Sequence, residues 1–304
     1  MTAAPLFFAL HHRGVLELSG EDRFSFLQGL ISVNTESITE NHAVWTALLT
    51  PQGKVLHDFF IVAYGETLFL ETERSQMETL QTRLLRYKLR ARVKIEVCAD
   101  HNVFGHLFPL PRELSALTNP GDTCLLPQAS GMAFIDPRLS KGGARLIIHP
   151  KNAALYGPVT EDLSTWECHR IHHGLPDGSQ DIIPEKGFLL EYGFEELNGV
   201  DFKKGCYVGQ ETTARMKWKQ LVKKRLLPVS IPARPTDIQP LASIDGPDRS
   251  AGYLCSAAPD KTSTGILALA ILNVRDLDRE DLQCNGYPVT VHRPHWLNLA
   301  NSQT

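Results

Sequence analysis

The sequence lacks clustered cysteines. Its six cysteines are each at least 26 residues from the next, and no CxxC pair or Cys/His cluster occurs. This spacing excludes a zinc ribbon, a ferredoxin-type cluster held by neighbouring ligands, and the disulfide framework of a small secreted domain. We therefore expect free thiols in a reducing compartment, at Cys98, Cys124, Cys168, Cys206, Cys255 and Cys284.

Long apolar runs are also missing. The longest beyond the N-terminal region, Gly265–Leu272, is far short of the ~20 residues that span a bilayer. The apolar stretch Ala3–Leu10 is interrupted by Pro5, and it lacks a preceding basic region, a following cleavage site and the repeated arginines of a presequence. These features predict a soluble, cytoplasmic protein without a membrane partner.

No charge of one sign dominates the chain. Thirty-one Lys and Arg stand against 34 Asp and Glu, which leaves a net charge of -3 and no global positive field for nucleic acid. Hydrophobic residues make up 42% and charged residues 21%, as in globular proteins. A length of 304 residues favours about two domains.

Strand and helix patterns alternate in short units, which predicts an α+β fold. Val55–Tyr64 has the pattern of a strand, and Glu73–Ala91 that of an amphipathic helix. Beyond Lys224 about six short strand-like runs follow one another, which indicates a small antiparallel β-barrel. We expect a two-lobed α+β region over residues 1–224, with the crossing between lobes near 108–128, and a barrel domain over residues 225–304.

Residues Asn198–Met216 hold the densest group of functional candidates. Gly205 and Gly209 flank Cys206 and allow tight turns or a close approach to a ligand. Two lysines precede Cys206 and a predicted helix follows it, and both features favour a thiolate. Cys206 is therefore either a reactive thiol or, as free cysteines commonly are, a small buried hydrophobic residue.

The run Lys204–Glu211, KGCYVGQE, resembles the KGCYxGQE signature of the YgfZ proteins, the folate-binding branch of the aminomethyltransferase (glycine-cleavage T-protein) superfamily. Weaker similarity extends over nearly the whole chain. The resemblance implies two α+β lobes that form a ring with a small C-terminal antiparallel barrel, and tetrahydrofolate in the central opening. It also implies a link to the assembly or repair of iron–sulfur enzymes, including those that thiolate tRNA.

The resemblance further implies the site residues. Cys206 is the expected functional thiol. Asp58 lies in the family's hairpin, but His57 stands where T-proteins carry a second aspartate, which argues against aminomethyl transfer. Three of the charged candidates could instead be surface residues. They are Asp58 at a strand end, Arg170 on a helix and Glu191 in an apolar run. The expected folate-binding residues are Asp58, Arg170, Glu191, Lys204, Gly205, Tyr207, Gly209, Gln210 and Glu211.

A basic strip follows the signature, with six cations and no acid between Arg215 and Arg225. The strip is either a solvated linker or a binding surface. As a binding surface it fits RNA or the polyglutamate tail of a folate, and of these two ligands we favour the tail. His172 and His173 are adjacent, a poor spacing for metal binding on one helix face, and we expect no metal site.

Three functions fit these observations. The first is a tetrahydrofolate-binding protein that supports iron–sulfur enzymes, and this is the function that we expect. The second is a folate-dependent one-carbon transferase that acts on a protein or RNA, so the sequence leaves open whether the chain is an enzyme. The third is a scaffold that binds partners without folate.

Overall fold

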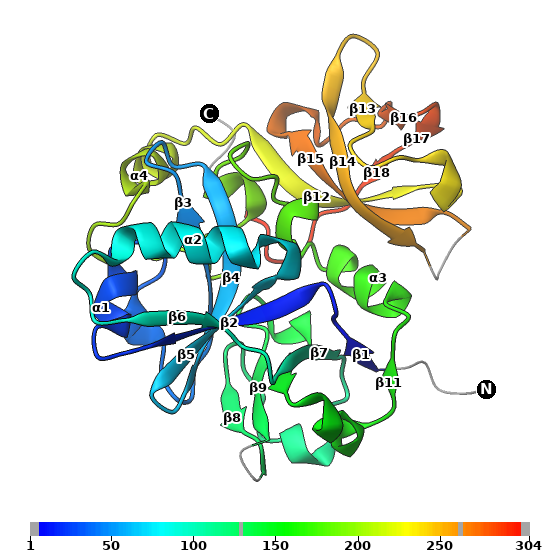
Figure 1. The fold of residues 1–304 in the computed structure, drawn as a ribbon. Coiled ribbons are helices and arrows are strands. Elements are labelled where there is room, and N and C mark those ends of the chain that lie inside the picture. The colour runs from blue at the N-terminus through cyan, green and yellow to red at the C-terminus, as the bar shows by residue number, and fades with distance from the viewer. Residues whose placement is uncertain (1–5, 128–129, 261–263, 299–304) are drawn as a thin grey trace.

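The chain forms three sheets around a common centre (Figure 1). The structure is a computed structural model, and it describes residues 6–127, 130–260 and 264–298. Within these residues no helix combines the length and apolar character that crossing a membrane requires. The helices are α1 (Arg23–Gln28), α2 (Met77–Lys88), α3 (Ser164–His172) and α4 (Gln210–Trp218). Short 3₁₀ helices cover Thr35–Ser37, Arg74–Gln76, Arg112–Leu114, Ser140–Gly142, Pro150–Tyr156, Gly178–Gln180, Leu189–Tyr192, Pro235–Asp237 and Val274–Asp276.

The first sheet follows the predicted hairpin. Val55–Tyr64 is a strand, as predicted, and alternation along it places Phe59 and Ile61 against α1 and α2. The helix predicted over 73–91 is shorter, because a 3₁₀ turn precedes α2. In spatial order the strands are β3 (Val44–Leu49), β4 (Val55–Tyr64), β5 (Thr67–Glu73), β2 (Arg13–Ser19) and β6 (Lys94–Val97).

The second sheet begins with a strand that the sequence did not reveal. Phe7–Ala9, inside the apolar stretch considered above only as a leader, is a fully buried strand. The chain passes from the first sheet to the second between β6 and β7, upstream of the crossing expected at 108–128, because that Pro- and Gly-rich segment connects strands of the same sheet. The order is β11 (Val159–Thr160), β1 (Phe7–Ala9), β7 (Asn102–His106), β10 (Ala144–Ile148), β9 (Gly131–Ile135) and β8 (Thr123–Leu125).

The third sheet is the predicted C-terminal barrel. Its two outermost strands, β17 and β18, are separated by one residue of chain, so seven antiparallel strands form a nearly closed barrel. The α+β fold with a C-terminal barrel is thus confirmed, while the domain limits 1–224 and 225–304 stay a prediction. The order is β17 (Tyr287–Pro288), β16 (Gln283–Cys284), β13 (Ser243–Asp245), β14 (Ser250–Pro259), β15 (Ile266–Asn273), β12 (Lys224–Ile231) and β18 (Thr290–Val291).

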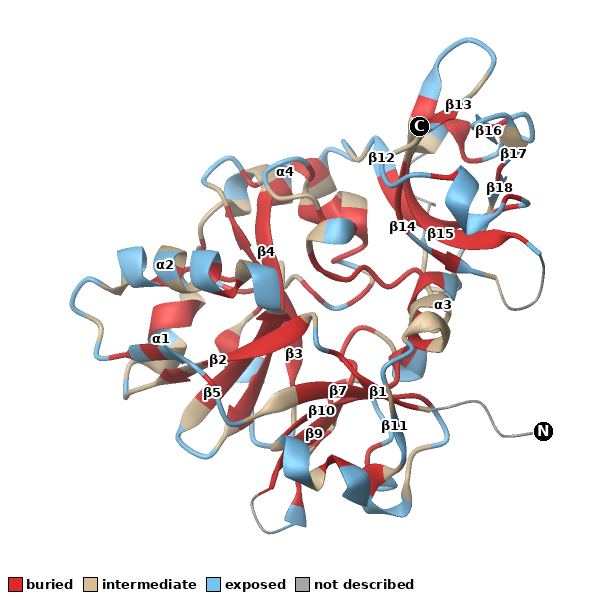
Figure 2. Cartoon of the chain, turned by 45° about the vertical axis from the view of Figure 1, so that its right-hand side comes forward, coloured by how far each residue is buried: buried red, intermediate tan, exposed pale blue. Residues whose placement is uncertain are grey.

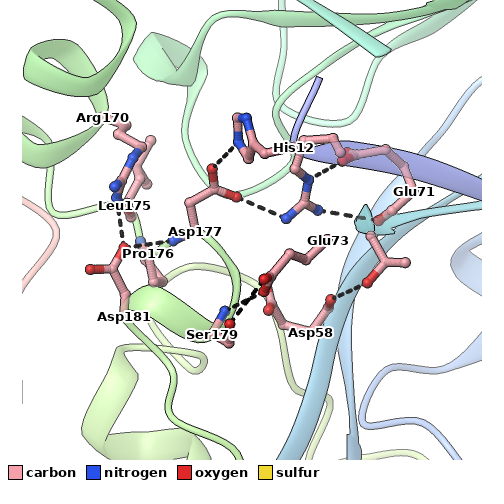
Figure 3. A network of polar contacts seen from close by, with 12 residues as sticks. His12, Asp58, Glu71, Glu73, Arg170, Leu175, Pro176, Asp177, Ser179 and Asp181 are labelled. Carbon is pink, nitrogen blue, oxygen red and sulfur yellow. Dashed lines mark hydrogen bonds and ion pairs between the residues drawn. The ribbon is translucent and has the colours of Figure 1, made fainter. Parts of the chain in front are cut away.

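A buried network of charges joins the sheets where they meet (Figure 3). Arg13 of β2 pairs with Glu71 of β5 and, at 2.8 Å, with Asp177, which lies on the segment after α3. Glu71 also accepts from Arg145 of the second sheet, at 3.2 Å. All these side chains are buried. Figure 2 shows that much of β2, of β4 and of the second sheet is buried. The network therefore fixes the first sheet against the second through charges that water cannot screen.

The same segment reaches the barrel through Asp181. One oxygen of Asp181 accepts from Arg170 of α3 at 2.7 Å, and the other accepts from the Ser256 hydroxyl of β14 at 2.6 Å. Although burial opposes ionisation of Asp177, the nearby Arg13 and His12 hold its pKa well below the usual range. Asp177 therefore contributes stability that is present above its unfolded pKa of about 3.9 and is lost as the pH falls toward the folded value.

Replacing Arg13 by Met should lower the free energy of unfolding by about 3–5 kcal/mol, because it removes the buried cation that Glu71 and Asp177 share. The change is measured by urea denaturation at neutral pH. The control Arg92→Met removes an exposed arginine paired with Glu21 and Asp22. It should cost less than about 1 kcal/mol. Equal effects of the two changes would contradict a structural role for the network.

Candidate functional site

The signature loop is fastened to the first lobe by Lys204. The buried Lys204 amine donates to three backbone carbonyls, those of Gln28 at 2.9 Å, Ile31 at 2.6 Å and Val33 at 2.8 Å. An ammonium group has three N–H donors, so all of them are used. Lys204 was predicted to bind folate, but its position is that of a clamp that holds the loop against the end of α1.

The two signature glycines have different surroundings. Gly209 has a φ of +82° and precedes α4, and a Cβ there would lie 2.6 Å from the carbonyl oxygen of Thr50 in the β3–β4 turn. Glycine is therefore required for the loop to pack on the first sheet. A Cβ on Gly205 would meet no atom within 4 Å. Gly205 thus borders open space beside Cys206.

The rest of the signature supports the loop from within. The Tyr207 side chain is buried, and burial raises the pKa of its hydroxyl to about 12. Its amide donates to the side-chain oxygen of Gln210 at 3.3 Å. Glu211 is exposed in the first turn of α4, where a negative charge is favourable. The predicted helix after the signature is confirmed as α4.

Cys206 is exposed, whereas the other five cysteines are buried or half-buried. The interpretation of Cys206 as a small buried hydrophobic residue is therefore wrong. Of the two lysines expected beside the thiol, Lys203 is exposed and Lys204 directs its charge at backbone carbonyls. The arrangement presents one accessible thiol on a rigidly anchored loop.

Asp58 lies elsewhere, at the edge of the central network (Figure 3). Its carboxylate accepts from the indole nitrogen of Trp45 at 3.0 Å. Burial raises the pKa of Asp58, although Arg13 and the Trp45 hydrogen bond oppose this shift. Both ring nitrogens of the neighbouring His57 are buried without a hydrogen-bond partner among the described residues, and burial, together with Arg83, lowers its pKa to about 4.

Arg170 and Glu191 are already engaged within the protein. The buried Arg170 guanidinium donates to Glu167, Asp181 and the carbonyl of Leu175, so it is neither solvated nor free for a ligand. Glu191 lies in a 3₁₀ helix, where it accepts from the Phe188 amide at 2.8 Å. Burial raises the pKa of Glu191, although that hydrogen bond and Lys54 oppose it.

Within the described part of the chain, no hydrogen bond or ion pair links signature residues 204–211 to Asp58, Arg170 or Glu191. The predicted site residues are therefore not joined by direct polar contacts, and Asp58 and Arg170 lie in the central region of buried charges. Sequence reasoning missed the other charges of that region, Arg13, Glu71, Asp177 and Asp181. For Arg13 and Glu71 the sequence signal was a charge in an otherwise largely apolar strand, whereas Asp177 and Asp181 lie outside the strands.

Three hollows border the segment 179–186. The one beside Asp58 is about 10 Å³ and lies against Ser179 and Ile182. Next to it, about 580 Å³ opens between Ser179, Ile183 and barrel residues such as Ser256. A third, of about 530 Å³, shares Ile183 and includes Lys186, Lys224 and Tyr253. Small-molecule pockets generally measure about 300–1,000 Å³, so the two larger hollows have the size for a ligand and the Asp58 hollow does not.

The basic strip 215–225 is partly neutralised. Lys217 pairs with Glu195, and Arg225, which is buried, pairs with Glu196 at 3.0 Å. Trp218 is exposed next to Phe202. Four of the six cations of the strip lie outside these two ion pairs. Binding of a polyglutamate tail to the strip stays a prediction.

The chain is similar to known proteins in its C-terminal barrel and over most of its length. Residues 223–299 match the model of the CAF17 C-terminal β-barrel domain. The mitochondrial iron–sulfur cluster assembly factor IBA57 of Homo sapiens is 31% identical over 241 residues, which are 73% of this chain and 65% of that protein. The chain is similar to the IBA57 assembly factors. The Neurospora crassa homologue is 30% identical over 240 residues, 72% of this chain and 52% of that protein, so the match spans about half of this IBA57 relative.

The fold has a second relative. The glycine cleavage system aminomethyltransferase T of Bartonella henselae superposes with a TM-score of 0.74 over 96% of this chain and 86% of that one, at 13% identity. The chain thus has the T-protein fold, as expected.

The cytoplasmic location predicted from the sequence is contradicted, because the IBA57 relatives of Neurospora crassa, Homo sapiens and Mus musculus are mitochondrial. Free cysteines indicate a reducing compartment, and they do not distinguish one such compartment from another.

Replacing Lys204 by Met should destabilise the protein by about 2–4 kcal/mol, because three buried carbonyls lose their donor. The matched control is Lys203→Met at the adjacent, exposed lysine, which should change stability by less than about 0.5 kcal/mol. Thermal denaturation of both variants measures the difference. If both changes proved equally mild, Lys204 would be free to contact a ligand.

Proposed function

We propose that this chain is a tetrahydrofolate-binding factor of the YgfZ type that supports the assembly or repair of iron–sulfur enzymes, including enzymes that thiolate tRNA, with Cys206 as its functional thiol. The observation that carries the proposal is the exposed Cys206 on its clamped loop, in a chain similar to the IBA57 assembly factors. Its partners are client iron–sulfur proteins and folate.

The anchoring of the loop supports a thiol that acts on a partner protein. Lys204 and Gly209 fix the loop at both sides of Cys206, while Gly205 leaves the space next to the thiol open. A thiol held this way loses little conformational freedom when a partner docks on it. An exposed position also suits a macromolecular substrate better than a small molecule, which is generally enclosed in a pocket.

The two larger hollows along 179–186 suit a folate. Their volumes accommodate it, and Lys186 and Lys224 at the rim of the 530 Å³ hollow offer positive charge to its glutamate carboxylates. The pterin ring offers N–H donors that pair with a carboxylate. Asp58 lines the small hollow that shares Ser179 with the 580 Å³ one, so it is the residue that we assign to the pterin. Arg170 and Glu191 line neither of the larger hollows and act by positioning their neighbours.

The alternative, a one-carbon transferase of the T-protein kind, has less support. His57 replaces the second carboxylate of the hairpin, and its low pKa keeps it neutral. The Asp58 carboxylate already accepts from Trp45, and the hollow beside it is too small for a second substrate next to the pterin. We therefore expect folate to bind without turnover.

Cys206→Ser should reduce the activity of client iron–sulfur enzymes at least tenfold in cells whose own copy of this gene is deleted, because a hydroxyl cannot replace a thiolate as a nucleophile or ligand. The measurement is client activity normalised to client protein. The matched control is Cys168→Ser at a half-buried cysteine, which should retain activity. Full activity of the Cys206→Ser cells would remove the thiol from the proposal.

Asp58→Asn should weaken tetrahydrofolate binding about 10- to 100-fold, the usual effect of losing a hydrogen bond to a charged group. Calorimetric titration of wild type, Asp58→Asn and Lys186→Gln gives the dissociation constants, and Lys88→Gln, at a half-buried lysine of α2, is the control. The same titration with 5,10-methylene-tetrahydrofolate tests for turnover. Consumption of its one-carbon unit would favour the transferase, and the absence of any folate binding would favour a scaffold.

A further inference from the structure

A cavity of about 790 Å³ lies outside both regions described above. It opens between α3, the loop at Lys141 and the segment that follows β18, and Figure 1 shows α3 between the barrel and the second sheet. Its volume is within the range of small-molecule sites. None of its lining residues belongs to the signature loop or to the central network, so neither the thiol nor the folate accounts for it.

The lining is rich in nitrogen. Side chains that carry, or can take up, a positive charge come from three parts of the chain, against one lining acid, Asp260. They are Lys141, three histidines of α3 and its C-cap (His169, His172, His173), and His292, Arg293 and His295 after β18. In a chain of net charge -3, this is a local concentration of cationic groups.

The α3 histidines lie too close together to be charged at once without a counter-ion. His169 and His173, four residues apart, have ring centroids 4.7 Å apart, and His173 and His172 have centroids 5.3 Å apart. The i, i+4 spacing of His169 and His173 thus adds a third ring to the adjacent histidines His172 and His173 that the sequence pattern had indicated. Burial and the neighbouring imidazoles lower the pKa of His173 to about 4. An anion among these rings would offset their mutual repulsion.

Backbone and side-chain contacts hold the rings in place. The Nε2 of His169 lies 2.6 Å from the carbonyl of Lys141, and that of His292 lies 2.9 Å from the Ser230 hydroxyl. The Trp296 indole donates to the carbonyl of His173 at 2.8 Å. A carbonyl accepts a hydrogen bond, so it orients the His169 ring with its Nε2 proton toward Lys141.

We propose that this cavity, the histidine cavity, binds a multivalent oxyanion, either a phosphate ester or a polycarboxylate. A metal ion is disfavoured, because the described residues contain no group of three or more His, Cys, Asp or Glu side chains placed to hold one. In addition, the Nε2 of His169 is hydrogen-bonded to the carbonyl of Lys141, so this nitrogen is not available to coordinate a metal ion. An oxyanion needs several N–H donors instead, which imidazolium groups, Lys141 and Arg293 provide.

Binding should take up protons. The groups that face the α3 rings are Lys141 from the second lobe, Cys168 on α3 itself, Asp260 after β14, and His292, Arg293 and His295 after β18. Asp136 and Glu167 lie nearby, and Arg293 pairs with Asp278. Burial lowers the pKa of His169 and of His173 in the empty cavity, so an anion that favours their charged forms must bind more tightly as the pH falls.

The test is calorimetric titration of the full chain with inorganic pyrophosphate and with citrate. Each titration is run at about pH 6 and at about pH 8, in a buffer that contains a chelator to remove metal ions. Both anions lose charge on acidification, so tighter binding at the lower pH must come from the protein. We expect at least one of them to bind tenfold or more tightly at pH 6 than at pH 8. Preference for pyrophosphate assigns a phosphate ester, and preference for citrate a polycarboxylate.

The double variant His172→Gln/His295→Gln changes two exposed rings of the cavity, and it should weaken binding at pH 6 at least tenfold and reduce the pH dependence. His42→Gln, in the first lobe, is the matched control and should bind as wild type. The melting temperatures of both variants should equal that of wild type. No binding of either anion at millimolar concentration, or binding that the double variant leaves unchanged, would overturn the proposal.

Discussion

Asp177 and Asp181, four residues apart on one segment, hold three parts of the fold together. Asp177 binds Arg13 and His12 at the first sheet, while Asp181 binds Arg170 of α3 and Ser256 of the barrel. Each of these contacts is buried or half-buried, so losing one partner leaves a charge that water cannot reach. The arrangement of the two lobes and the barrel therefore depends on these two carboxylates.

The same network explains why the centre differs from a simple ligand opening. Guanidinium groups of Arg13 and Arg138 lower the pKa of Asp58, while burial raises it more. The space beside Asp58 is small because Ser179 and Ile182 come close to it. Ser179 also binds Glu73, both through its amide at 2.7 Å and through its hydroxyl. A ligand that reaches Asp58 must therefore enter from the barrel side, where the hollows are larger.

Much of the fold could be predicted from the sequence. The strand-like run Val55–Tyr64 predicted β4, the apolar spacing of α2 predicted a helix, and short strand-like runs predicted the barrel. The strand Phe7–Ala9 was missed, since three apolar residues carry no periodicity and their burial depends on partners in β7 and β11.

The roles of the site residues could be predicted less well. The segment 198–216 was singled out from the sequence, and the exposure of its Cys206 is consistent with a reactive thiol. Lys204 and Arg170 were expected at a ligand, yet both are occupied within the protein. Nothing near Lys204 in the sequence indicates its acceptors, which lie 171 to 176 residues earlier. That distance in the chain also bears on biosynthesis. The carbonyls that receive Lys204 are made first, and the loop that carries the thiol is completed only after two-thirds of the chain. Until then the nascent chain has no anchored thiol.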